Sequence, residues 1–341
     1  MSRAVCCLIG GGGLIGRHLV PILQASGREV VVYDHYPPEA NFPDTKYIVA
    51  QYDDESLLQS LLTRCEEIVD MAYASHHKSN FENPITDLIN NAPTSVAIFQ
   101  WALNCRCLRR ILFVSSGGTV YGPTTQWPTQ ETATNQPISP FGITNLTLEK
   151  YAFMFHHTRG LPALVVRPGN AYGPGQMPFT GQGFIATAIG SVMRGQPVPV
   201  FGGGATVRDY IYVEDLARGI LAALERGQLG EAYNLGTGVG LSNMQVLTAI
   251  ESIAHAHGHG HEVMIEHHPA RGFDVPINIL DCSKITNGTG WQPCVAFDKG
   301  LAQTWAAISA TLSKQNNLTM QQQNPLGGVE YISSHATDIV I

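Results

Sequence analysis

The sequence of 341 residues lacks an apolar run long enough to span a membrane. It also lacks a basic run, and the net charge of −7 argues against nucleic acid as the main partner. Any anionic ligand would therefore be bound by local arginines. Glycines interrupt the first apolar segment, so we interpret it as a strand and not as a signal peptide. We expect a cytoplasmic protein with neither a membrane nor a nucleic-acid partner.

Paired metal-binding cysteines are absent as well. The seven cysteines are an odd number without metal spacing, and Cys6 and Cys7 fall in a predicted buried strand, so we expect reduced core thiols. The histidines of 255–261 alternate with Gly and Ala, but no Cys or carboxylate completes a defined spacing. We interpret them as a solvated loop before a strand at Glu262–Glu266, and we predict no metal site.

The chain up to about residue 170 alternates strand-like and helix-like segments, which predicts an α/β fold with a doubly wound parallel sheet. After Pro174 the Gly and Pro content rises, and helices are expected at about 183–194, 214–226 and 242–256. We predict a dinucleotide-binding domain at 1–174, a smaller mixed α/β substrate domain at 175–312, and a loosely ordered Gln- and Asn-rich tail at 313–341. The predicted strands of the first domain are Val5–Ile9, Val30–Tyr33, Tyr47–Ala50, Glu67–Met71, Arg110–Ser115 and Ala163–Arg167.

A glycine-rich turn follows the first predicted strand. Its sequence, Ile9 to Gly16, is IGGGGLIG, and a helical pattern begins directly after it. The glycines fit two registers, one starting at Gly11 and one at Gly10, and both end on Gly13 and Gly16. A turn of this kind lets the backbone approach a pyrophosphate, whose charge the helix N-terminus then stabilises. The expected ligand is a dinucleotide.

Asp34 ends the second predicted strand, about 20 residues beyond the glycines. There a carboxylate can accept both hydroxyls of the adenosine ribose and repels a 2′-phosphate. Neither His35 nor Tyr36 offers a fixed positive charge to such a phosphate. NAD is therefore favoured over NADP.

Several further segments appear in a fixed order along the chain. Together with the glycine turn they resemble the extended short-chain dehydrogenase/reductase family, within it the nucleotide-sugar epimerases of the UDP-glucose 4-epimerase type, from about residue 4 to 308. The segments are Asn83-Pro84 with Asn90-Asn91, VSSGGTVYG (114–122), SPFG (139–142), RPGNAYGPGQ (167–176), VRDYIYVEDLA (207–217), NLGTG (234–238) and ARGFDV (270–275).

The resemblance implies a Rossmann-type fold, NAD as the cofactor, a UDP-hexose as the ligand and a homodimer formed through the two helices that flank the active-site segment. The family commonly has an acidic residue after the third strand to bind the adenine amine, where this chain has Gln51; Asp53 or Asp54 is the alternative. Asn91 is the alternative to Asn90. The implied cofactor-binding residues are Gly10, Gly13, Leu14, Ile15, Gly16, Asp34, Gln51, Tyr52, Ala72, Asn90, Ser115, Asn145 and Pro168. The implied substrate-binding residues are Asn170, Phe184, Val200, Phe201, Arg208, Arg271 and Asp274. The two arginines suit the diphosphate of the ligand, because guanidinium groups pair with diphosphate oxygens.

The catalytic pair of the family is missing from this chain. Active members use a Tyr and, four residues later on the same helix face, a Lys. The ammonium lowers the pKa of the phenol, which then removes the proton of the sugar 4-hydroxyl. Here Phe141 stands at the Tyr position and Asn145 at the Lys position. Two origins fit these residues equally well: a natural member that has lost or exchanged its chemistry, or a chain in which both residues were replaced to trap a ligand.

Other groups near this segment are weaker candidates. Gly117 stands where many members have a catalytic Ser, and Thr119, two residues later, can present a hydroxyl on the same face of an extended segment. Lys150 and Tyr151 follow Phe141 by about two and a half helical turns and are expected on the opposite side of the helix. We interpret Tyr121 as a structural aromatic.

Two classes of function fit these observations. The first is an NAD-dependent nucleotide-sugar 4-epimerase that acts through a transient 4-keto sugar, with Thr119 near the reacting hydroxyl. The second is a catalytically inactive protein that binds NAD and a nucleotide sugar. A 4,6-dehydratase is not expected, because those relatives have an Asp-Glu pair where this chain has Gly118 and Thr119.

Overall fold

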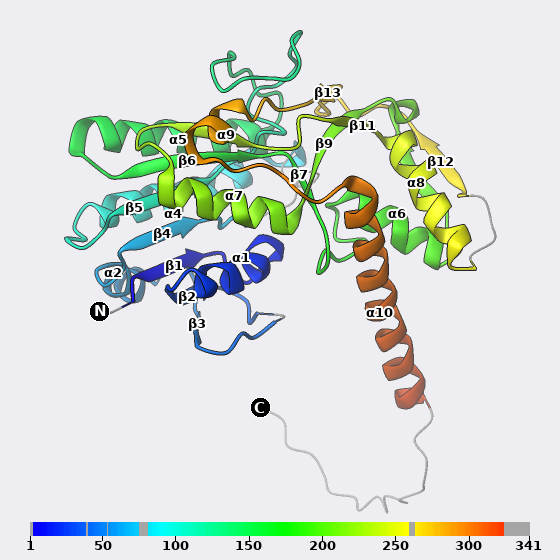
Figure 1. The fold of residues 1–341 in the computed structure, drawn as a ribbon, viewed down its shortest axis with the longest axis horizontal. Coiled ribbons are helices and arrows are strands. Elements are labelled where there is room, and N and C mark those ends of the chain that lie inside the picture. Colours follow the sequence, from blue (N-terminus) through cyan, green and yellow to red (C-terminus); the bar gives the residue numbers. More distant parts are fainter. Residues whose placement is uncertain (1–2, 39, 53, 75–80, 259–262, 324–341) are drawn as a thin grey trace, which may run out of the picture.

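A seven-stranded parallel sheet forms the larger part of the molecule in the computed structural model, which describes the chain except residues 1–2, 39, 53, 75–80, 259–262 and 324–341 (Figure 1). Each strand predicted for the first domain is present, with bounds that differ by at most two residues. In sheet order the strands are β10 (Ala232–Leu235), β6 (Ala163–Pro168), β5 (Arg110–Val114), β4 (Glu67–Asp70), β1 (Val5–Ile9), β2 (Glu29–Asp34) and β3 (Thr45–Val49).

Helices cover both faces of this sheet, which explains why its central strands are almost continuously apolar. One face packs against α1 (Leu14–Ala25) and α7 (Val213–Arg226), around Leu19, Leu23 and Leu216. The opposite face packs against α2 (Glu55–Leu62), α4 (Pro84–Ala102) and α5 (Pro140–Arg159). The predicted doubly wound α/β fold is confirmed.

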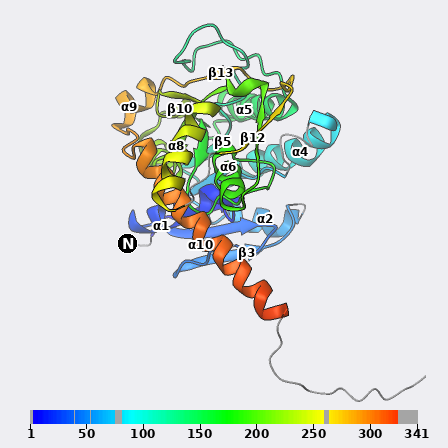
Figure 2. The ribbon, with the colours of Figure 1, turned by 90° about the vertical axis from the view of Figure 1, so that its right-hand side faces the viewer.

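The smaller part has mixed sheets and its own core. One sheet pairs β9 (Val207–Tyr212) with β7 (Asn170–Tyr172), β11 (Gly240–Ser242) and β13 (Ile277–Asn278), and the other pairs β8 (Val198–Phe201) with β12 (Ile265–His268). The helices α6 (Phe184–Met193), α8 (Asn243–Ala256) and α10 (Phe297–Gln323) pack here around Ile189, Ile250 and Trp305. Figure 2 shows α6, α8 and α10 together on this side of the molecule.

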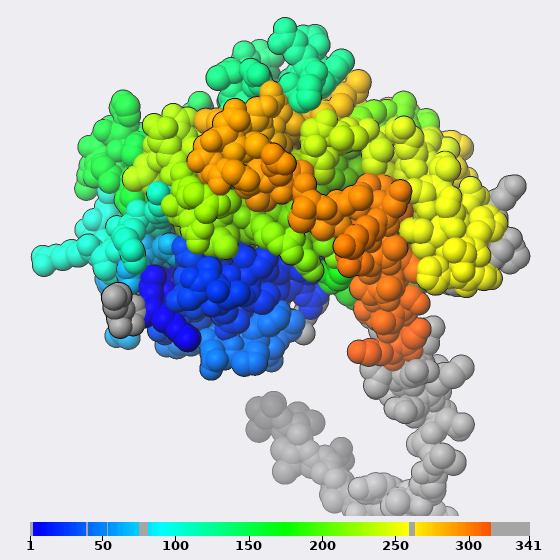
Figure 3. Space-filling model, viewed as in Figure 1, coloured from blue at the N-terminus to red at the C-terminus, as the bar shows by residue number. Residues whose placement is uncertain are grey.

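The domain division differs from the prediction in two places. Strand β10 and helices α7 and α9 (Ser283–Thr289) follow residue 174 in the sequence, but they belong to the larger part. The chain therefore returns to the first sheet, which a boundary drawn by composition cannot show. Helix α10 extends to Gln323, so the first eleven residues of the predicted tail are helical, and the ribbon of the helix projects from the rest of the molecule (Figure 1). Figure 3 shows the earlier part of α10, in orange, against the smaller part. The tail residues extend a helix whose first part already packs on the smaller core through Leu301, Trp305 and Ile308, and extending a formed helix costs less than starting one. Gln is also a good helix former.

Candidate functional site

The glycine turn lies between the ends of β1 and β4, where the strand order reverses. In open α/β sheets this is the place where ligands bind. Gly10 has a φ of 76°, and a Cβ there would stand 2.6 Å from Ala72 Cα. At Gly16 a Cβ would stand 2.1 Å from the carbonyl oxygen of Gly11. Both positions therefore require glycine for close backbone packing.

Gly13 is different, because a Cβ there would meet no atom closer than 4.0 Å. It is the N-cap of α1, and no side chain caps the helix at this position. Because no side chain caps the helix, the backbone N–H groups of its first turn, at Leu14 and Ile15, are available to a ligand. A cradle of this kind fits the diphosphate of a dinucleotide.

The Asp34 carboxylate is fixed at the rim of this turn. Its Oδ2 accepts a hydrogen bond of 2.9 Å from the N–H of Gly12, and its Oδ1 accepts one of 3.2 Å from the N–H of Tyr36. This places an anionic acceptor at the end of β2, one strand away from the glycine turn. The arrangement suits a ribose that offers two hydroxyl donors.

Beyond β3 the structure gives less support for an adenine contact. The Gln51 residue is exposed, and its backbone carbonyl oxygen accepts a hydrogen bond of 2.6 Å from Tyr33 Oη. Tyr52 lies with its ring 5.3 Å from the ring of His35. Asp54 caps α2 by accepting the N–H of Leu57, so its carboxylate already has a structural partner. Asp53, the other alternative, is outside the described residues.

Asn90 and Asn91 have different environments on α4. Asn90 is exposed, whereas only 4% of Asn91 is exposed. Asn91 Oδ1 accepts the N–H of Ala74 at 2.7 Å, just beyond β4, and its Nδ2 donates to the carbonyl oxygen of Asp87 at 2.8 Å. Of the two residues, Asn91 is thus the one that faces the end of β4, because successive residues of a helix are about 100° apart. A cofactor contact of either residue stays a prediction.

The segment after β5 is tightly packed. The N–H of Gly117 donates to the carbonyl oxygen of Pro168 at 2.8 Å, and a Cβ at Gly117 would stand 2.7 Å from both Arg167 O and Leu280 Cδ1. A serine at this position would therefore need the surroundings to shift. Thr119 lies against the first turn of α5, where its carbonyl oxygen approaches Gly142, and its hydroxyl is buried without a hydrogen-bond partner among the described residues.

Helix α5 begins at Pro140, after Ser139 caps it by accepting the N–H of Gly142. Asn145 is buried, and its Nδ2 donates to the carbonyl oxygen of Phe141 at 2.9 Å. The two residues thus share one helix face, as their spacing predicts. Lys150 and Tyr151 are exposed, on a different part of the helix from buried Asn145. Neither side chain therefore lies on the buried face that carries Asn145.

A buried ion pair lies under this segment. Arg167 Nη2 donates to Glu149 Oε2 at 2.6 Å, and Ser115 Oγ donates to Glu149 Oε1 at 2.5 Å. Arg167 also donates to Tyr121 Oη, which in turn donates to Asn234 Oδ1 at 2.6 Å. Burial raises the pKa of Tyr121 to about 12. Tyr121 and Ser115 therefore have structural partners, as we predicted for Tyr121.

The predicted substrate residues gather in the smaller part. The Arg271 guanidinium lies 4.3 Å from the centre of the Phe201 ring, and its Nε donates to Asp274 Oδ2 at 2.8 Å. Arg208 is largely buried, it donates to the carbonyl oxygen of Val275, and burial lowers the pKa of its guanidinium. Val200 and Phe201 end β8, next to the loop that carries Arg271.

Two further residues predicted to bind substrate, Asn170 and Phe184, lie on other elements than Arg271 and Phe201. Asn170 begins β7, and its Oδ1 would lie 3.4 Å from a Cβ at Gly118, so it faces the segment after β5. Phe184 begins α6 and packs on the smaller core.

A scan against protein families matches residues 6–236 to the NAD dependent epimerase/dehydratase family. The chain belongs to this family. The description of the family also confirms NAD as the predicted cofactor.

The relatives cover almost the whole chain. A UDP-glucose 4-epimerase of Mycolicibacterium smegmatis is 31% identical over an alignment of 304 residues, and the match covers 86% of this chain and 95% of the relative. The crystal structure of a UDP-glucose 4-epimerase from Thermotoga maritima with UDP-glucose has a TM-score of 0.84 and 31% identity, and covers 90% of this chain and 99% of its own. The crystal structure of a dTDP-glucose 4,6-dehydratase from Streptomyces venezuelae with NAD bound has a TM-score of 0.83 and 26% identity. The match covers 91% of this chain and 98% of the dehydratase chain.

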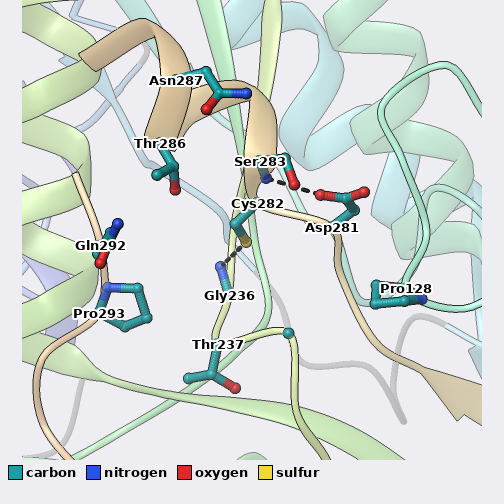
Figure 4. Close-up of a pocket in the computed structure, with 11 residues that line it drawn as sticks. Pro128, Gly236, Thr237, Asp281, Cys282, Ser283, Thr286, Asn287, Gln292 and Pro293 are labelled. Atoms are coloured by element: carbon teal, nitrogen blue, oxygen red, sulfur yellow. Dashed lines mark hydrogen bonds between the residues drawn. The ribbon is translucent and has the colours of Figure 1, made fainter. Parts of the chain in front are cut away.

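Outside this site the described residues offer little other chemistry. A pocket of about 570 Å³ lies at the start of α9, where Cys282 Sγ accepts the N–H of Gly236 (Figure 4). Burial raises the pKa of this thiol, and no predicted site residue lines the pocket.

Within the described part of the chain, no three His, Cys, Asp or Glu side chains are placed to hold a metal ion, and no helix is long and apolar enough to cross a membrane. Of the histidine stretch, residues 259–262 are outside the described part.

Proposed function

We propose that this protein binds NAD and a UDP-hexose, and that it interconverts the configuration at the sugar 4-carbon only slowly compared with members that have the Tyr and Lys. The observation that carries the proposal is the contrast within one site. The open cradle at Gly13 with Asp34, and the Arg271 group with Phe201, retain the features needed for binding. Phe141 cannot ionise, and Asn145 is bonded to its own helix.

The cofactor residues fit NAD by their chemistry. The first turn of α1 would hold the diphosphate, and Asp34 would accept the ribose hydroxyls. When bound, NAD supplies the hydride acceptor and donor for the sugar 4-carbon. The protein must then hold the sugar and move the proton of its 4-hydroxyl.

The substrate residues fit a nucleotide sugar by charge and shape. Arg208 and Arg271 would pair with the diphosphate of the ligand, with Asp274 holding the Arg271 fork in place. The ring of Phe201 beside Arg271 forms a flat apolar surface for the base. The choice of a UDP-hexose over other nucleotide sugars rests on the resemblance to the 4-epimerases.

Binding and turnover are tested separately on the purified full chain. Calorimetric titration with NAD and then with UDP-glucose or UDP-galactose measures affinity, and a coupled assay measures interconversion. We expect both ligands to bind. Loss of both binding events would contradict the proposal, whatever the turnover.

Restoring the catalytic pair is the sharper test of turnover. The double variant Phe141→Tyr with Asn145→Lys should raise interconversion by about 100- to 10,000-fold, the contribution of a general base. Phe141→Tyr alone is the matched control, because it lacks the ammonium that lowers the pKa of the phenol. An unchanged rate in the double variant would mean that the sugar does not reach this segment.

A second function is favoured by the same two residues. With Phe141 and Asn145 in place of the acid/base pair, the protein would bind NAD and a nucleotide sugar without converting either. Ligand binding with no interconversion, even at high enzyme concentration, would favour this alternative.

A further inference from the structure

A tyrosine that the sequence analysis did not single out lies against Phe141. The ring of Tyr73 is 4.6 Å from that of Phe141, in an edge-to-face arrangement. Tyr73 follows Ala72, which packs against the glycine turn at Gly10. A phenol therefore stands at the carboxyl edge of β4, beside the residue that replaces the catalytic tyrosine of the family.

The hydroxyl of Tyr73 is paired with a buried carboxylate. Tyr73 Oη lies 2.8 Å from Asp87 Oδ1 and 3.0 Å from Oδ2, and donates to this carboxylate on α4. Only 1% of Asp87 is exposed, and it also accepts a hydrogen bond of 2.6 Å from Thr144 Oγ1 on α5. Three elements thus converge on one carboxylate next to Phe141.

This arrangement differs from a tyrosine beside a lysine. Burial and the neighbouring Asp87 raise the pKa of Tyr73, so the phenol stays protonated at neutral pH. Such a phenol is a poor base by itself. It can accept a proton only while it gives its own proton to Asp87, whose carboxylate is already within hydrogen-bond distance.

We propose that Tyr73 and Asp87 form a proton relay that replaces the missing catalytic pair. Tyr73 is the catalytic residue at the sugar, and Asp87 stores the proton. This inference rests on the proposed binding of NAD and a UDP-hexose.

In the forward step the O4–H bond of the sugar breaks and its proton passes to Tyr73 Oη. The proton of Tyr73 passes at the same time to Asp87, which becomes a neutral carboxylic acid. Bound NAD would supply the acceptor for the hydride of the 4-carbon, so that the C4–O bond becomes a carbonyl. The return reverses each transfer on the other face of the sugar, and Asp87 becomes a carboxylate again.

Kinetics separates this relay from a structural role. Tyr73→Phe keeps the ring contact with Phe141 but removes the hydroxyl, so we expect kcat for interconversion to fall by at least about 100-fold. The dissociation constants of NAD and UDP-glucose should change by no more than about threefold. Tyr151→Phe, on the exposed part of α5, is the matched control and should change neither. Asp87→Asn is the second variant, for use if Tyr73→Phe folds poorly. It should lower kcat by the same factor.

A readout independent of turnover tests contact with the sugar. Incorporation of 3-fluorotyrosine labels the 12 tyrosines, and the ¹⁹F resonance missing in Tyr73→Phe identifies Tyr73. Addition of UDP-glucose to the NAD complex should shift this resonance and leave that of Tyr151 unchanged.

The outcomes separate this relay from the proposed function. If the native protein binds both ligands but kcat is unchanged in folded Tyr73→Phe and Asp87→Asn, the relay is overturned and the binding proposal stands. The same holds if the native protein binds both ligands and shows no interconversion. An unshifted Tyr73 resonance in the saturated complex would also overturn the relay. Failure of the native protein to bind either ligand would overturn the proposed function.

Discussion

At the scale of single residues, Phe141 and Asn145 are the two that carry the proposed loss of acid–base chemistry. Phe141 preserves the packing of an aromatic ring at the start of α5, and Asn145 stays on the same helix face. Neither can exchange a proton at neutral pH. Other residues in the same region do carry buried ionisable groups, and their environments can be tested one at a time.

Asp70, at the end of β4, is one such group. It is completely buried, and its Oδ2 has no hydrogen-bond partner among the described residues. Burial raises its pKa from 3.8 to about 6. Because the folded state prefers the neutral acid, Asp70 favours folding below pH 4, and this contribution is lost as the pH rises to about 6. The loss is about 3 kcal/mol at 1.36 kcal/mol per pH unit.

The prediction is tested by urea unfolding of the native protein and of Asp70→Asn between pH 4 and pH 7. The free energy of unfolding of the variant relative to the native protein should increase with pH over this range. Asp281→Asn is the control, because Asp281 is close to the surface and its pKa is lowered. A pH-independent difference for Asp70→Asn would contradict the burial argument.

Elements are held together by a few close contacts. Helix α1 begins against the sheet because Gly10 and Gly16 allow backbone packing that no side chain could share. Helix α5 is attached to β6 by the pair of Glu149 and Arg167. The first contact shapes the turn at which we propose that NAD binds, and the second stabilises the packing of α5 on the sheet.

Gly13→Ala separates binding from folding. The φ of Gly13 is −81°, and the added methyl group meets no protein atom within 4.0 Å, so the melting temperature should stay unchanged. The methyl group would occupy the space that a diphosphate needs, so we expect NAD affinity to fall at least tenfold, about 1.4 kcal/mol. Gly288→Ala is the control for the melting temperature and for NAD affinity, because Gly288 lies in α9 and a Cβ there would also have open space around it. Equal NAD affinity in both variants would argue against the cradle.

The buried pair predicts a large change in stability. Glu149→Gln removes the charge that compensates Arg167, of which only 4% is exposed. We expect the free energy of unfolding to fall by about 3–5 kcal/mol in guanidinium chloride. Glu66→Gln is the control, because Glu66 pairs with Arg109, whose side chain is 63% exposed, and such pairs contribute about 0–1 kcal/mol. If the free energy of unfolding falls by a similar small amount in Glu149→Gln and Glu66→Gln, Glu149 does not compensate a buried charge on Arg167.

At the scale of the whole molecule, α4 and α5 pack side by side and leave apolar side chains on the surface. Ile85 is 69% exposed and Ile89 62% on α4, and Ile143 is 51% exposed on α5. Exposed apolar groups on two adjacent helices are typical of an interface. The predicted homodimer would cover this face with a second copy.

Ile89→Asp tests the dimer. A buried unpaired charge would weaken the interface, so the variant should sediment as a monomer of about half the native mass. Val239→Asp, at a residue that is 59% exposed and lies outside both helices, is the control and should leave the mass unchanged. A native monomer at micromolar concentration would contradict the prediction. A cytoplasmic location also stays a prediction.

The sequence by itself determined the α/β fold, the glycine turn, the place of Asp34 at the end of β2 and the four-residue spacing of Phe141 and Asn145, because strand patterns, turn residues and helix spacing depend on neighbours in the chain. Only the tertiary structure decided that β10 joins the first sheet, that Asn91 and not Asn90 bonds to the backbone beyond β4, and that Gly117 has no room for a side chain. It also brought together Tyr73, Asp87 and Thr144, which are separated by up to 71 residues. Contacts between distant segments depend on how the elements pack, and no local pattern encodes them.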